Sequence, residues 1–351
     1  MSEMLPYTPT GEELAEVGQV LDLSAYTLDP LKEWEPLQYA FSKDGIGLAP
    51  RGDIQVVKAP QKNGKTFLLT LMMGAVLRGE YLGLKCEIED ARALFIDTEQ
   101  HPRNTQLVYR RVCHIAGLDG HQYNDRIKML HMRGAQVEMI RKAILQEIVF
   151  WKPDVVFIDG VVDCVVDPND QAESKAYITE LSAIAMRHNC SIWSVLHVNP
   201  GSDKMRGHLG TIMSQKVSDV LSCVKKKQPD GSIVFEVEQT DTRNKDVTKL
   251  TFVIENRQTS NNEFIAVPVA PYVSDSEKAK LNDMMQEIFC TGPMTPRELY
   301  EAVKEKFGVK RARCYEIVRD AKDNGIIDYD QLVTNKYRYV GILKTSDEAP
   351  F

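Results

Sequence analysis

Short unbroken apolar runs alternate with amphipathic stretches over the first two thirds of the chain. Runs with both faces apolar are typical of buried parallel strands. We expect such strands at residues 54–57, 93–97, 127–130, 154–159 and 190–196. Apolar positions at helical spacing separate them and predict helices that start at residue 67 and span 103–116, 137–150 and 174–188. Strands and helices in alternation predict an α/β fold with a mostly parallel sheet.

A different pattern follows residue 200. Residues 220–224, 233–237 and 250–254 are apolar strands in close succession, and Asp230-Gly231 marks a hairpin turn between the first two. These strands are therefore expected to be antiparallel. After a linker at 268–276, the pattern predicts three helices and then two short strands, which is the outline of a winged helix. These five elements are expected at residues 278–289, 296–307, 311–324, 325–327 and 336–340.

Four parts are expected along the chain. Residues 1–50 are an N-terminal arm, acidic and polar up to about residue 34, and form either an extension on the surface or an arm that packs on a neighbouring subunit. Residues 51–270 form the main domain and residues 271–345 the winged-helix-like domain. Residues 346–351 are a tail.

Composition narrows the class of protein. A hydrophobic content of 43% and a charged content of 26% are ordinary for a globular protein. The formal net charge of −7 argues against a uniformly basic nucleic-acid binder, although it leaves room for a local basic face. Seven cysteines without CxxC spacing indicate reduced thiols rather than a disulfide framework or a zinc site. We see no signal peptide and no membrane-spanning run, so we expect a cytoplasmic protein with no membrane partner.

The strongest motif lies between the first strand and the first helix. Strand, tight loop, Gly-Lys-Thr and helix form the setting of a phosphate-binding loop, in which backbone N–H groups and the helix N-terminus surround a phosphate. Lys65 would reach the β- and γ-phosphates of ATP, and the Thr66 hydroxyl would bind Mg²⁺. The usual motif opens with glycine, whereas Ala59 stands there. The expected nucleotide contacts are Pro60, Gln61, Lys62, Asn63, Gly64, Lys65, Thr66 and Phe67.

Polar residues at the ends of three later strands complete a candidate site, because ligands of open α/β sheets bind at the carboxyl ends of the strands. Glu99 is the candidate to orient or deprotonate water, ahead of Asp97. Asp159 would hold the Mg²⁺ shell, usually through water, with Asp163 as second choice. His197 can contact the γ-phosphate; the alternative is a structural histidine at a strand end.

Basic residues form two candidate nucleic-acid contacts. Lys204 and Arg206, with His208, occupy a glycine-containing loop at 201–210 that is suited to a single strand; a plain solvated loop is the alternative. The winged-helix region carries Lys310, Arg311, Arg313 and Arg338, which suit the phosphates of duplex DNA. Its alternative is a protein-docking module.

The order of these motifs over residues 53–255 resembles the RecA-like ATPases, especially the hexameric RepA and DnaB-type replicative helicases of plasmids and mobile elements. The resemblance implies ATP and Mg²⁺ as cofactors, a homohexamer with ATP between subunits, and single-stranded DNA in the ring channel. It makes Glu99 the catalytic glutamate and His197 the sensing residue. It also makes Arg243 the arginine presented to a neighbour's γ-phosphate. Asp241 stands where the family often has lysine, and Lys245 is an alternative to Arg243.

Three functions are compatible with these features. The first is an ATP-dependent helicase or translocase in replication or mobilisation of a plasmid or mobile element. The second is a RecA-like ATPase that acts as a DNA-binding regulatory switch without translocation. The third, a small-molecule P-loop kinase, is disfavoured because no acceptor-binding lid is evident and the C-terminal domain would be unexplained.

Overall fold

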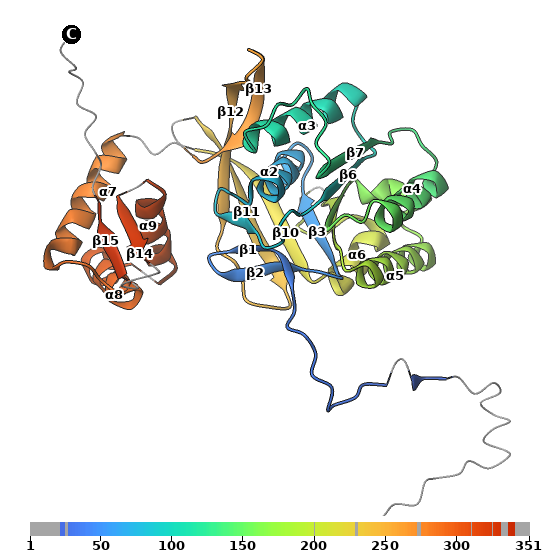
Figure 1. Cartoon of the computed structure of the whole chain (residues 1–351), viewed down its shortest axis with the longest axis horizontal. Helices are drawn as coiled ribbons and strands as arrows, with labels where there is room; N and C mark the ends of the chain where they lie inside the picture. The colour runs from blue at the N-terminus through green and yellow to red at the C-terminus, as the bar shows by residue number, and fades with distance from the viewer. Residues whose placement is uncertain are drawn as a thin grey trace, which may run out of the picture.

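A computed structural model describes the chain at residues 22–24, 27–199, 201–228, 231–271, 275–309, 311–324, 326–330 and 336–340. Within this part, the main sheet has nine strands in the order β13-β12-β11-β10-β3-β9-β8-β6-β7 (Figure 1). The parallel strands are β3 (Ile54–Ala59), β6 (Ala93–Asp97), β7 (Ile127–His131), β8 (Val155–Asp159), β9 (Ser191–His197) and β10 (Asp219–Lys227). The antiparallel extension consists of β11 (Ile233–Thr242), β12 (Leu250–Gln258) and β13 (Phe264–Val269). The α/β fold with antiparallel C-terminal strands is confirmed.

Helices cover both faces of this sheet, which explains why its strands are apolar on both sides. On one face, α2 (Lys65–Arg78) and α3 (Pro102–Ile115) pack in a core that includes Phe95, Phe157 and Trp193. The other face is covered by α4 (Val137–Phe150), α5 (Gln171–His188) and α6 (Gly207–Lys216). Burial of two apolar cores fixes the sheet between them.

The region before the first predicted strand contains further structure. β1 (Tyr39–Lys43) and β2 (Ile46–Pro50) form a hairpin that joins β5 (Leu84–Cys86) and β4 (Glu80–Tyr81) in a small sheet. The turn is Asp44-Gly45, with positive φ at both residues, as type I′ hairpin turns require. The arm expected over residues 1–50 therefore gives way to packed strands at Tyr39.

The C-terminal elements form a smaller unit with its own core. It contains α7 (Asp275–Ile288), α8 (Pro296–Phe307), α9 (Arg311–Asp323), β14 (Ile327–Asp330) and β15 (Lys336–Tyr339). The expected linker at 268–276 is shorter than predicted, because β13 continues to Val269 by pairing with β12. The guanidinium of Arg319 donates to the Lys249 carbonyl at 2.9 Å and joins this unit to the main domain. The winged-helix identification stays a prediction.

Two further expectations concern the ends of the chain and membranes. The predicted tail at 346–351 lies outside the described residues. Among the residues that the structure does describe, no helix has the length and apolar character needed to cross a bilayer.

Candidate nucleotide site

The candidate site lies where four parallel strands end side by side. β3 leads into the phosphate loop, β6 into Glu99, and β8 and β9 end at Asp159 and His197. The strand register places Ala59 opposite His197, and Asp97 opposite Asp159. Parallel pairing therefore gathers residues that lie far apart in the sequence at one edge of the sheet.

The phosphate loop presents unused backbone donors. Its hydrogen bonds into α2 begin with the Leu68 N–H, which donates to the Gly64 carbonyl at 2.9 Å; no protein hydrogen bond in the described part of the chain uses the N–H groups from Gln61 to Phe67. Gly64 has φ 82°, and a Cβ there would lie 2.5 Å from the Phe235 ring. A row of free donors at a helix N-terminus fits a phosphate group.

Individual loop residues differ in what they do. The Pro60 carbonyl accepts a hydrogen bond from Lys65, and the side chains of Gln61 and Lys62 are exposed. The Asn63 side chain points into the protein, where its Oδ1 accepts from the Lys225 N–H of β10 at 2.8 Å and its Nδ2 donates to the Gln61 carbonyl. The fold thus uses Asn63 to fasten the loop.

Phe67 faces the core, and its ring lies 4.8 Å from the Arg111 guanidinium. Its side chain is therefore a packing element of α2. Any contact with a phosphate from this residue has to come from its backbone N–H, as the loop geometry allows.

Lys65 joins the loop to the end of β9. Its Nζ lies 2.9 Å from Nδ1 of His197 and donates to the Pro60 carbonyl at 3.2 Å. Burial lowers the pKa of Lys65, and the carboxylates of Asp159 and Glu99 oppose this shift. Burial also lowers the pKa of His197, and the charge of Lys65 adds to that effect. A neutral His197 can accept from Lys65 through Nδ1, which leaves its Nε2–H directed at other groups.

Thr66 and Asp159 form the candidate Mg²⁺ position. The Thr66 hydroxyl donates to Oδ2 of Asp159 at 2.9 Å. Asp159 is 2% exposed, and burial, followed by the charge of Glu99, raises its pKa to about 7. Neighbouring donors and positive charges offset only part of the cost of burying this carboxylate, so a cation would fit beside it. No cluster of three or more His, Cys, Asp or Glu metal ligands occurs in the described residues.

Glu99 lies beside the same group of residues. Its Oε1 is 3.8 Å from Nε2 of His197, and burial raises its pKa. A Cβ added to Gly160 would lie 2.6 Å from Glu99 Oε1, so the Glu99 carboxylate occupies space that only glycine leaves open. The Asp159–Gly160 peptide bond is cis. Gly160 is a residue that the sequence analysis did not select.

Asp97 holds the loop that carries Glu99. Its Oδ1 accepts from the backbone N–H groups of Glu99 and Gln100, and its Oδ2 accepts from the Thr105 hydroxyl at 2.7 Å. Asp97 is fully buried. It is therefore a positioning residue, and the signal for this role is an acid at a strand end followed two residues later by the candidate base.

Asp163, the second choice for the metal, lies in a neighbouring network. Its Oδ2 accepts from the Thr98 hydroxyl at 2.7 Å, and Thr98 Oγ1 accepts from the Gly160 N–H at 3.0 Å. Asp163 is therefore bonded, through Thr98, to the turn that follows β8.

The predicted basic loop after β9 directly adjoins the site. Arg206 N–H donates to the His197 carbonyl at 2.9 Å, and Lys204 O accepts from Asn199 N–H. Both side chains are exposed, and neither has an ion pair among the described residues. The loop is shorter than expected, because α6 begins at Gly207 and includes His208. Leu209, buried against α5, draws this stretch into the helix despite its glycines.

The structure does not bring Arg243 to these residues within one chain. Arg243 follows β11, where Thr242 pairs with Asp219 and Asp219 pairs with Gln55 near the start of β3. This is the opposite end of β3 from Lys65. Arg243 and Lys245 are both exposed, and the Arg243 guanidinium donates to the Lys216 carbonyl. A role for either residue in ATP hydrolysis therefore requires a second subunit.

The C-terminal basic residues are engaged locally. Arg311 donates to the Tyr315 hydroxyl, Arg313 pairs with Glu316, and Arg338 pairs with Asp328. Lys310 lies outside the described residues. The carboxylates of Glu316 and Asp328 reduce the net positive charge that this unit offers to a phosphate backbone.

Comparison with known proteins agrees with the site. Residues 43–203 match the family described as an AAA domain, and this segment contains the phosphate loop, Glu99, Asp159 and His197. This match and the site residues support a RecA-like P-loop ATPase, a class that generally binds ATP with Mg²⁺. A KaiC-like protein of the hyperthermophilic archaeon Pyrococcus horikoshii OT3 is similar in structure, with a TM-score of 0.45 and 16% identity over 66% of this chain and 100% of that one. No curated protein matches the sequence.

Proposed function

We propose that this protein is an ATP-dependent nucleic-acid motor, a RepA-like helicase or translocase in replication or mobilisation of a plasmid or mobile element. The observation that carries this proposal is a continuous path of contacts. Arg206 bonds the His197 carbonyl, and the His197 ring bonds Lys65 of the phosphate loop. A nucleic-acid strand bound to the loop that carries Arg206 could therefore shift His197 and Lys65, the residues expected to contact the γ-phosphate.

The proposed partners follow from the same geometry. Single-stranded DNA would bind Lys204 and Arg206, which are exposed and have no ion pair among the described residues. ATP would bind at the strand ends with Mg²⁺ at Thr66 and Asp159; when bound, the Mg²⁺ neutralises charge on the phosphates. A homohexamer would place Arg243 of one subunit near the nucleotide of the next.

The test measures ATP hydrolysis by the full chain with and without single-stranded DNA. We expect stimulation by DNA in the native protein and no hydrolysis by Lys65→Ala, which loses the phosphate contact. The double variant Lys204→Ala/Arg206→Ala should keep its basal rate and lose the stimulation, because the backbone bond to His197 is unaffected. Equal rates with and without single-stranded DNA would contradict the motor proposal while leaving ATPase activity intact.

A second candidate is a DNA-dependent regulatory switch without translocation. The contact between Arg319 and the Lys249 carbonyl favours it, because it ties the C-terminal unit to the residue that directly precedes β12. In this case duplex DNA would stimulate hydrolysis at least as well as single strands, and Arg311→Ala/Arg313→Ala would weaken duplex binding. Strand separation on a forked substrate would favour the helicase over this switch.

A further inference from the structure

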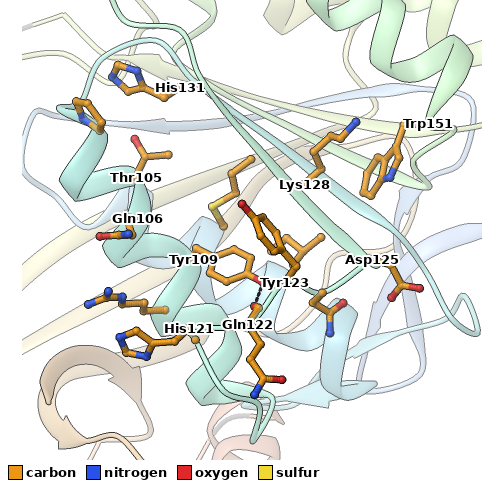
Figure 2. Close-up of a pocket in the computed structure, with 16 residues that line it drawn as sticks. Thr105, Gln106, Tyr109, His121, Gln122, Tyr123, Asp125, Lys128, His131 and Trp151 are labelled. Carbon is orange, nitrogen blue, oxygen red and sulfur yellow. Dashed lines mark hydrogen bonds between the residues drawn. The ribbon is translucent and has the colours of Figure 1, made fainter. Parts of the chain in front are cut away.

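A second cavity lies away from the nucleotide site, between α3, the loop at 116–126 and the edge strand β7. Its volume is about 810 Å³, within the range of cavities that hold small organic ligands. Figure 2 shows Tyr109 of α3 and Tyr123 of the loop near the centre of its lining, with Lys128 and Trp151 to one side. Neither the proposed motor nor the proposed switch uses this cavity.

Aromatic side chains are the first distinctive feature of the lining. Tyr109, Tyr123 and Trp151 all contribute to it. Tyr123 is fully exposed, although neighbouring atoms normally cover part of a tyrosine ring. Planar apolar faces at the mouth of a cavity favour a planar ligand that can stack on them.

The loop that carries Tyr123 is fixed at several points. The Tyr109 hydroxyl donates to the Gln122 carbonyl at 2.6 Å, and Asp119 accepts from the Asn261 amide at 3.0 Å. Arg126 donates to the Val76 carbonyl at the end of α2. The exposed ring is thus held by an anchored loop, and a ligand would meet a cavity that is already formed, which lowers the entropic cost of binding.

The lysine and the arginine of the lining are already paired with carboxylates. Lys128 Nζ lies 2.6 Å from Glu147, and Arg110 lies 2.9 Å from Glu263. An anionic group therefore has little to gain from them. The neutral amides of Gln106, Gln122 and Asn124 also line the cavity and offer donors and acceptors of the kind that recognise base edges.

From this combination of stacking faces, amides and neutralised charges, we propose that the cavity binds a nucleobase. The base would be carried either by a free nucleotide or by an unpaired residue of a single strand. It would stack on Tyr123 and present its edge to the amides, with its sugar and phosphate toward solvent. This site is separate from the phosphate loop and goes beyond the proposed function.

The test uses 2-aminopurine, a base whose fluorescence falls when it stacks on an aromatic ring. The full-length protein is first saturated with Mg²⁺ and inorganic tripolyphosphate, which can fill the phosphate loop and carries no base that could compete for the cavity. Two probes are titrated separately: the 2-aminopurine nucleoside, and a short single-stranded oligonucleotide that ends in 2-aminopurine. Tyr123→Ala removes an exposed ring, and Tyr123→Phe retains the stacking face.

Phe150→Ala is the matched control, because Phe150 is also highly exposed and precedes Trp151 without lining the cavity. We expect quenching in the native protein, in Tyr123→Phe and in Phe150→Ala. Affinity should fall roughly 5- to 150-fold in Tyr123→Ala, the range expected for one lost stacking contact. Quenching of the nucleoside would show that the cavity binds a base without an attached strand. Quenching of the oligonucleotide alone would show that the base has to be part of a single strand. No quenching of either probe, or quenching that Tyr123→Ala leaves unchanged, overturns the proposal whether or not the protein hydrolyses ATP.

Discussion

At the scale of single residues, the site is a set of buried ionisable groups whose neighbours offset only part of the cost of burying their charges. Lys65 and Glu99 have pKa values shifted toward their neutral forms by burial, and the pKa of Asp159 is raised to about 7. Shifted pKa values of this kind cluster at functional sites. A bound ligand of opposite charge can stabilise the charged forms that burial disfavours. A nucleotide triphosphate and a divalent cation would supply opposite charges to Lys65 and to Asp159, respectively.

Glu99→Gln should separate binding from turnover. The amide keeps the shape of the side chain but cannot accept a proton from water, so turnover should fall by about 10²–10⁴, the usual contribution of a general base. Binding of a fluorescent ATP analogue with Mg²⁺ should change little, because the Glu99 side chain has no hydrogen bond or ion pair with the phosphate loop among the described residues. Hydrolysis at the native rate by this variant would refute the assignment of Glu99.

Gly160→Ala should slow turnover without weakening nucleotide binding. The new methyl group would meet Glu99 Oε1 and displace the carboxylate, and a displacement of about 1 Å can cost roughly 10²-fold in rate. The control is the double variant with Glu99→Gln. If Gly160 acts through Glu99, the double variant should be no slower than Glu99→Gln alone. Additive losses of rate would show that Gly160 acts in another way.

At the scale of elements, the sequence predicted much of the main sheet, because each parallel strand is a continuous apolar run. It located the helix at 137–150 and the strand at 93–97 with the bounds that the structure has. It also indicated which strand ends carry Glu99, Asp159 and His197. Their mutual distances could not be predicted, since these depend on the order of strands in the sheet.

The elements that the sequence analysis missed are short or partly polar. The β1–β2 hairpin lies in a stretch that looked like a polar arm, although Asp44-Gly45 was a usable turn signal. β4 and β5 have two and three residues, too few to show a period. The role of Asp97 was missed for a different reason. Two of its hydrogen bonds come from backbone N–H groups, which leave no pattern in side-chain polarity, so its position two residues before Glu99 was the available signal.

Asp219→Ala should destabilise the main domain. Asp219 is 2% exposed and joins three elements: its Oδ2 accepts from the Ala49 N–H of β2, and its Oδ1 accepts from Gln239 and Thr242 of β11. Removing it leaves the buried Ala49 N–H without an acceptor, whereas the half-buried Gln239 and Thr242 donors can turn to water, so we expect a loss of about 1–3 kcal/mol. Urea unfolding measures this change in the free energy of unfolding.

The control for Asp219→Ala is Asp246→Ala, a change at an exposed aspartate in the loop after β11. It should alter the free energy of unfolding by no more than about 0.5 kcal/mol. Equal stability of the two variants would contradict the role given to Asp219 in joining the hairpin to the sheet.

At the scale of the whole molecule, the residues that we predict to be catalytic do not all meet within one chain. The site gathers Lys65, Thr66, Glu99, Asp159 and His197, whereas Arg243 lies at the other end of β3. Phosphoryl-transfer enzymes commonly complete such a site with an arginine. Assembly of several copies would therefore be part of the chemistry that we propose, and not only a means to enclose DNA.

ATP turnover per subunit should then rise with protein concentration across the range in which the protein assembles. An arginine supplied by a neighbour is worth about 10³–10⁵ in rate in other systems. Arg243→Ala should abolish the rise, while Lys245→Ala should preserve it if Arg243 is the contributing residue. The measurement is turnover against concentration, with the mass of the assembly determined in parallel. A constant turnover per subunit would argue against catalysis between subunits.

The order of strands in the main sheet also bears on how the protein is made. β3 is the first strand of this sheet to be synthesised, and it lies between β9 and β10. Its partner for Ile54 is Ile192, which is 138 positions later (192 − 54). At roughly 5–20 residues per second, the ribosome delivers that partner about 7–28 s later. During that interval an apolar strand with two open edges emerges next to the unfinished phosphate loop, so chaperone capture of the nascent chain would have its natural target there.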